Sequence, residues 1–134
     1  MNKKTLVSLF LMTLLFIVVG CSDKVGMRGK VTFSDDQSPL TVGQITFTSD
    51  SVLARGHLKP DGTYVIGTEK EKDGLPKGTY IVSIEYAVEN IMRPSVGGLP
   101  PTAIQRSLIA PLEPKTVVVD GKTKIYNIVV DRPK

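Results

Sequence analysis

The chain has 134 residues, a formal net charge of +4, one cysteine and one histidine. This length suits a single domain. One cysteine excludes a disulfide within the chain, and one histidine with one cysteine is too few for an ordinary zinc site. The cations are dispersed and the few aromatic residues do not interleave with them, so the composition argues against nucleic-acid binding.

Residues 1–20 have the layout of a secretion signal. Lys3 and Lys4 give a positive start, and an apolar stretch follows from Leu6 to Val19. A membrane-spanning helix is the competing interpretation, but 14 residues reach only about 21 Å against a hydrocarbon core of about 30 Å. Because residues 1–20 carry two lysines and no acid, their removal leaves 114 residues with a net charge of +2.

The signal ends in Val18-Val19-Gly20-Cys21, which resembles the lipobox of bacterial lipoproteins. The resemblance implies cleavage between Gly20 and Cys21, a diacylglycerol on the Cys21 thiol and, in many bacteria, an N-acyl chain. Several acyl chains on one residue anchor a protein stably, so the lipid bilayer becomes a partner through Cys21. We expect no other cofactor. The alternative is that Cys21 is an ordinary buried thiol.

Lipidation would place the protein in the bacterial cell envelope. In many proteobacteria an Asp after the lipidated cysteine retains a lipoprotein in the inner membrane, and this chain has Ser22 there. For such a Gram-negative host we expect the outer membrane rather than the inner one.

After Cys21 the chain consists of short stretches of alternating apolar and polar residues between turn residues, a pattern typical of an all-β sandwich or small barrel. We expect strands at about 25–33, 42–48, 52–58, 63–68, 80–86, 116–119 and 124–131. The last two should form a hairpin around residues 120–123. The alternation predicts inward-facing side chains for Val25, Met27, Val31, Phe33, Ile45, Phe47, Ala54, Leu58, Tyr64, Ile66, Tyr80, Val82, Ile84 and Tyr86.

Several motifs occur in a characteristic order: Gly29-Lys30-Val31-Thr32-Phe33, Gly43-Gln44-Ile45-Thr46-Phe47, Pro60-Asp61-Gly62-Thr63-Tyr64 and Asp73-Gly74-Leu75-Pro76-Lys77-Gly78-Thr79-Tyr80. Their order is similar to that in transthyretin-like, carboxypeptidase-regulatory-like (prealbumin-like) domains. The resemblance covers residues 25–131 and implies a seven-stranded Greek-key sandwich of the immunoglobulin or prealbumin type, usually without catalysis. The expected organisation is a signal peptide at 1–20, a lipidated end and tether at 21–24, and the sandwich at 25–131.

The candidate chemical groups argue against an enzyme. His57 lies near the end of its predicted strand on the outward face, beside Arg55, and no second histidine or free cysteine can join it in a metal site. The sequence contains no Gly-x-Ser-x-Gly motif and no phosphate-binding glycine loop. Asp35 and Asp36 lack the spacing of a calcium loop and are interpreted as solvated turn acids.

A long connection at residues 88–114 is the first candidate for function, because structureless loops of this length are uncommon. One interpretation is a crossover that covers the open end of the sandwich, with a helical turn at 103–107. The other is an exposed apolar patch that docks an envelope protein. The candidate partner-binding residues are Ile91, Met92, Val96 and Leu99.

A second candidate is a set of cations close to the anchor. Lys24, Arg28 and Lys30 share the outward parity of the first predicted strand, and only three residues separate Cys21 from residue 25. These side chains can contact anionic headgroups, or they can be ordinary solvated strand charges. The resulting expectation is a membrane-anchored, non-catalytic binding or structural module. The alternative function is an accessory subunit of an envelope transport or secretion complex.

Overall fold

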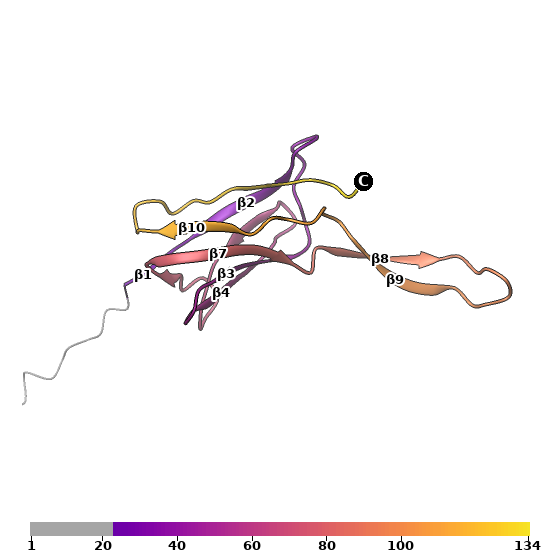
Figure 1. The fold of residues 1–134 in the computed structure, drawn as a ribbon, viewed down its shortest axis with the longest axis horizontal. Coiled ribbons are helices and arrows are strands. Elements are labelled where there is room, and N and C mark those ends of the chain that lie inside the picture. The colour runs from indigo at the N-terminus through magenta and orange to yellow at the C-terminus, as the bar shows by residue number, and fades with distance from the viewer. Residues whose placement is uncertain (1–22) are drawn as a thin grey trace, which may run out of the picture.

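The computed structural model describes residues 23–134, which form two β-sheets packed face to face (Figure 1). The larger sheet has the order β10-β7-β3-β4 and is antiparallel throughout. Its strands are β3 (Gln44–Thr48), β4 (Leu53–His57), β7 (Gly78–Glu85) and β10 (Lys115–Val119). The second sheet has the order β11-β2-β5, with β2 (Arg28–Phe33), β5 (Thr63–Val65) and β11 (Ile128–Val130). The predicted all-β, seven-stranded sandwich is confirmed.

Two further strand pairs lie outside these two sheets. β1 (Lys24–Val25) pairs with β6 (Leu75–Pro76), and β8 (Val88–Arg93) pairs with β9 (Thr102–Ser107). Since β1 begins at Lys24, the last residue of the expected tether already belongs to the domain. The predicted signal peptide, Gly20 and Cys21 lie outside the described residues. No helix within residues 23–134 is long and apolar enough to cross a bilayer.

The core lies between the sheets, where the predicted alternation places apolar side chains. Phe47 is fully buried and meets the rings of Tyr80 and Tyr126 edge-on, at centroid distances of 6.3 and 6.1 Å. Other predicted inward residues are also buried: Val25, Met27, Val31, Phe33, Ile45, Ala54, Tyr64, Ile66 and Val82. Burial on this scale, at about 25 cal/mol per Å² of apolar surface, is the main stabilising contribution.

The prediction for Tyr86 is wrong. Its side chain is 71% exposed, and its φ of 57° lies in the left-handed region. This conformation breaks the alternation of inward and outward side chains after β7. Ala87 is therefore buried, and Tyr86 is not. The strand β7 therefore ends at Glu85, one residue before the predicted end at Tyr86.

The predicted hairpin of 116–119 with 124–131 is also wrong. β10 pairs with β7, whereas β11 crosses to the second sheet and runs parallel to β2, with Ile128 opposite Val31. The crossing depends on Gly29. A Cβ atom there would lie 1.8 Å from the carbonyl oxygen of Tyr126, and the buried hydroxyl of Tyr64 donates a hydrogen bond to that oxygen.

The prediction of a crossover with a helical turn at 103–107 is wrong as well. Residues 88–107 form an antiparallel hairpin, which we call the arm, and residues 102–107 are its second strand. Figure 1 shows that the arm projects beyond the sandwich instead of covering its end. The chain returns to the core only afterwards, where Leu108, Ile109 and Leu112 pack against it.

Lys24 and Asp73 hold the β1–β6 end of the domain together. Lys24 Nζ donates to Asp73 Oδ2 at 2.7 Å, and the Asp73 carboxylate also accepts hydrogen bonds from the backbone N–H groups of Thr68 and Lys70. These donors hold the pKa of Asp73 well below its ordinary value of 3.8, with the hydrogen bond from Lys24 as the largest cause. The same contact raises the pKa of Lys24.

We expect Gly29→Ala to lower the free energy of unfolding by more than about 2 kcal/mol, because the new Cβ must displace the Tyr126 backbone. Urea denaturation measures the change. The matched control is Gly26→Ala, since a Cβ at Gly26 meets no atom within 4 Å. Equal stabilities of the two variants would show that the close approach at Gly29 is unimportant.

We expect Asp73→Asn to lower the melting temperature by a few degrees at pH 7. Because the pKa of Asp73 is depressed in the folded state, its contribution is full above the unfolded value near 4 and is lost as the pH falls below that value. The melting temperatures of wild type and variant should therefore converge in acid. Asp50→Asn, at an exposed position, is the control. A difference that persists unchanged at pH 2 would contradict this explanation.

Candidate functional site

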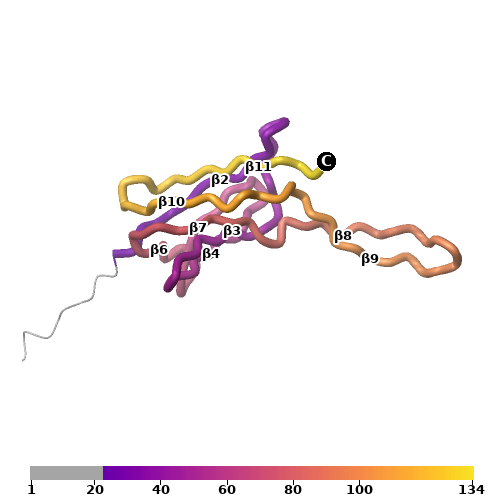
Figure 2. The backbone as a smooth tube through the Cα atoms, in the orientation of Figure 1, coloured from indigo at the N-terminus to yellow at the C-terminus, as the bar shows by residue number. Residues whose placement is uncertain are grey.

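The arm is the most prominent feature outside the sandwich. In Figures 1 and 2 it extends from one end of the domain, and β1 lies at the opposite end. Its strands pair only with each other among residues 23–134. Ile91 lies opposite Ile104, Glu89 forms an ion pair with Arg106, and these side chains occupy one face of the hairpin.

The tip of the arm is uncharged and apolar. No charged residue occurs between Pro94 and Gln105. Gly97 and Gly98 have φ values of 63° and 83°, and the N–H of Leu99 donates to the carbonyl of Val96 at 3.2 Å, which closes a turn that suits two glycines. Met92, Val96 and Leu99 are 66–70% exposed.

Three of the four predicted partner-binding residues are therefore exposed on the arm. They are Met92 near the end of β8, and Val96 and Leu99 beside the tip turn. Ile91 differs, because it is half-buried and faces its cross-strand neighbour Ile104. The structure brings all four residues onto one projecting element.

The base of the arm is a single narrow point on the sandwich. The N–H of Leu108 donates to the carbonyl of Ala87 at 2.8 Å, so the two ends of the arm meet directly. Ala87 is buried and Leu108 packs against the core. The sandwich therefore encloses its core without help from residues 88–107.

A basic groove lies on the outer face of the second sheet. Its volume is about 410 Å³, and its lining includes the cations Arg28, Lys30 and Lys59 but no acidic residue. Val65 and Ile125 supply apolar walls, with Val65 directly opposite Arg28 in the ladder. Such a surface suits an anionic group that also carries apolar atoms.

The predicted trio of Lys24, Arg28 and Lys30 is thus divided. Arg28 and Lys30 share the basic groove, whereas the side chain of Lys24 is only 19% exposed and holds Asp73. Lys59 takes the third place. Sequence reasoning missed it because the turn between β4 and β5 brings it to the groove, where its N–H donates to the carbonyl of Thr63. The Pro60-Asp61-Gly62 turn was the available signal.

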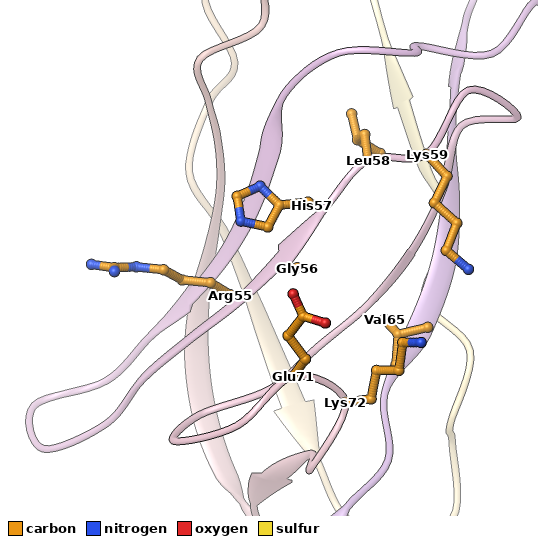
Figure 3. A pocket seen from close by; sticks show the side chains of 8 residues that line it. All are labelled: Arg55, Gly56, His57, Leu58, Lys59, Val65, Glu71 and Lys72. Carbon is orange, nitrogen blue, oxygen red and sulfur yellow. The ribbon is translucent and has the colours of Figure 1, made fainter.

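A smaller pocket of about 230 Å³ lies beside the end of β4 (Figure 3). His57 and Arg55 come from β4, and Glu71 and Lys72 come from the loop before β6. His57 is exposed and occupies the last position of β4, as predicted. The lining contains no serine, threonine or cysteine that could act as a nucleophile. Within residues 23–134, no group of three or more His, Cys, Asp or Glu side chains is placed to hold a metal ion.

Asp35 and Asp36 lie in the turn after β2 and contact the C-terminal segment. Arg132 donates to both carboxylates, at 2.9 and 3.1 Å, and its guanidinium lies 3.8 Å from the centre of the Phe33 ring. Hydrogen bonds from Ser38 are the largest cause of the lowered pKa of Asp36, which is about 2. Through Arg132, these two acids therefore hold the C-terminal segment against the turn after β2.

The fold is similar to that of BcpA, the major pilin subunit of Bacillus cereus, with a TM-score of 0.53 at 9% sequence identity. The match covers 83% of this chain and 30% of the pilin subunit, so this chain spans about a third of that protein. A 9R-lipoxygenase from Cyanothece also aligns, over 82% of this chain and 16% of the lipoxygenase, at 17% identity. Its TM-score of 0.37 is too low to support a conclusion about fold or function. No family model and no curated protein matches the chain. At such low identity, the likeness to the pilin subunit shows a β-sandwich fold alone.

Proposed function

We propose that this protein is a lipid-anchored, non-catalytic β-sandwich module of the bacterial cell envelope, and that the arm is its partner-binding element. The observation that carries the proposal is the position of the arm, which projects from the end of the sandwich opposite β1. The path to Cys21 leaves the domain at the β1 end. Anchoring there leaves the apolar tip of the arm unobstructed.

The connection between the anchor and the sandwich is short. Two peptide units separate Cys21 from Asp23, a distance of at most about 7 Å when extended. The domain would then lie close to the bilayer surface. Ser22 supports the outer membrane over the inner one in a Gram-negative host with the usual sorting signal.

The basic groove supplies a second contact with the membrane. Arg28, Lys30 and Lys59 would meet anionic headgroups, each contributing up to about 1 kcal/mol near the surface. Lys24 makes a smaller contribution in this arrangement, because its ammonium group is engaged by Asp73.

Membership of the transthyretin-like, carboxypeptidase-regulatory-like domains is part of the proposal. The order of the glycine and turn motifs supports it, together with the division of seven strands into sheets of four and three. An accessory subunit of an envelope transport or secretion complex is the second candidate function, and the exposed tip residues Val96 and Leu99 favour it equally.

We expect the wild-type chain to incorporate a palmitate analogue during growth and to yield an intact mass in which residues 1–20 are replaced by acyl chains on Cys21. Cys21→Ala should abolish the labelling, because the thioether needs the thiol. Ser22→Ala, one residue away, should keep it. An unmodified Cys21 thiol in the wild-type protein would refute lipid anchoring.

We expect Arg28→Gln, Lys30→Gln and Lys59→Gln together to weaken vesicle binding of the unlipidated domain at least about tenfold. Vesicles of phosphatidylcholine with and without phosphatidylglycerol test this in a sedimentation assay. The matched control replaces the exposed Lys115, Lys122 and Lys134 with Gln. If both triple variants bind anionic vesicles equally, general charge explains the binding and the basic groove does not.

A further inference from the structure

We infer that the arm binds a second copy of this chain, by antiparallel pairing of β8 with β8 of the partner subunit about a two-fold axis at Ile91. The inference deepens the proposed function by naming a partner for the arm. It rests on that function only in treating the arm as the binding element, and it does not depend on lipidation.

The first observation is the open edge of β8. One side of β8 pairs with β9, and the other side meets no strand among residues 23–134. Alternate residues of such an edge carry backbone N–H and C=O groups that can accept another strand. A hairpin alone is only marginally stable, whereas three or more strands that share a hydrophobic face can form a stable sheet. Pairing with a second arm would provide those strands.

The second observation is the charge pattern along β8. Glu89 and Arg93 lie two residues before and two residues after Ile91. Antiparallel pairing about Ile91 therefore places Glu89 opposite Arg93 of the partner subunit, and Arg93 opposite the partner's Glu89. Arg93 is exposed and has no carboxylate within ion-pair distance among residues 23–134. The second copy would supply that carboxylate.

The third observation concerns the apolar residues on the same face. Ile91 and Ile104 are cross-strand neighbours, and neighbours across a ladder point to the same face of the sheet. Pairing at β8 would extend this row to four isoleucines, Ile104 and Ile91 from each copy. In the next row, Glu89 would lie between Arg106 of its own chain and Arg93 of the partner subunit.

β9 does not offer the same match. Pairing of two copies about Ile104 would place Arg106 opposite Thr102 of the partner subunit, with no opposite charge. Charged residues on an edge strand usually prevent pairing with other chains. On β8 the two charges have opposite signs at equal distances from Ile91, so they attract an antiparallel copy. This symmetry selects β8 as the interface.

The test uses the full chain, extracted from membranes in mild detergent, with two different affinity tags on co-expressed copies. We expect wild-type copies to associate. Glu89→Arg alone and Arg93→Glu alone should each weaken self-association at least about tenfold, because like charges then face each other across the two-fold axis. Co-expression of the Glu89→Arg chain with the Arg93→Glu chain should restore association, since one copy carries two cations and the other carries two anions. Gln105→Glu on β9 is the matched control and should associate like wild type.

Disulfide crosslinking provides an independent test of the register. Directly opposed residues of antiparallel strands have Cα atoms about 4.5–5.5 Å apart, within disulfide range. We expect Ile91→Cys to crosslink two copies under mild oxidation. Ile104→Cys, on the same face of β9, should not, and wild type controls for Cys21. Monomeric wild type, self-association of both single variants at wild-type strength, or equal crosslinking at positions 91 and 104 would each overturn the inference.

Replacement of residues 88–107 by Asn-Gly separates this inference from the proposed function. Ala87 and Leu108 already meet through a backbone hydrogen bond, so a two-residue turn can join them and leave the sandwich folded. If the replacement abolishes association but the charge variants do not change it, the arm binds by another route, and only the β8 pairing fails. If association survives the replacement, the copies associate through the sandwich and not through the arm, so the β8 pairing fails, whereas lipid anchoring is decided separately by the labelling of Cys21.

Discussion

The close approach of the Tyr126 carbonyl to Gly29 is the constraint on which the arrangement of the sheets depends. Only a residue without a side chain leaves room for this contact, and Tyr64 donates its buried hydroxyl to the same oxygen. The C-terminal segment is thereby aligned with β2, and Ile128 and Val130 enter the core. Without this contact, β2 would lose its parallel neighbour, and the core would be open on that side.

Because the sheets enclose their core independently, the chain can carry a long insertion at one point. Tyr86 leaves the alternation with a positive φ, and the backbone of Ala87 meets Leu108 after the excursion. The arm contributes no residue to the core cluster. Its exposed apolar tip and open strand edges are therefore not needed to complete the core.

The cations of the domain have two different roles. Lys24 is engaged by a carboxylate that two backbone N–H groups also hold, so its charge stabilises the β1–β6 end. Arg28 and Lys30 are opposite no acid in their groove, and Lys59 joins them from a distant turn. The same residue type thus forms an ion pair in one place and lines a basic groove in another. The burial and the partners of each side chain decide which case applies. Strand parity does not decide it, because Lys24, Arg28 and Lys30 all share the same parity.

The sequence by itself determined the fold class, most of the strands and most of the core, because the two-residue period of a half-buried strand is a local property. The positions of Val31, Phe47 and Tyr64 in the core and of His57 at an exposed strand end followed from that period alone. Only the tertiary structure decided the partners of the strands. The parallel course of β11, the projection of the arm and the place of Lys59 all depend on contacts between residues far apart in the chain. Local periodicity carries no information about such contacts, since the space at Gly29 and the meeting of Ala87 with Leu108 exist only after the sheets have packed.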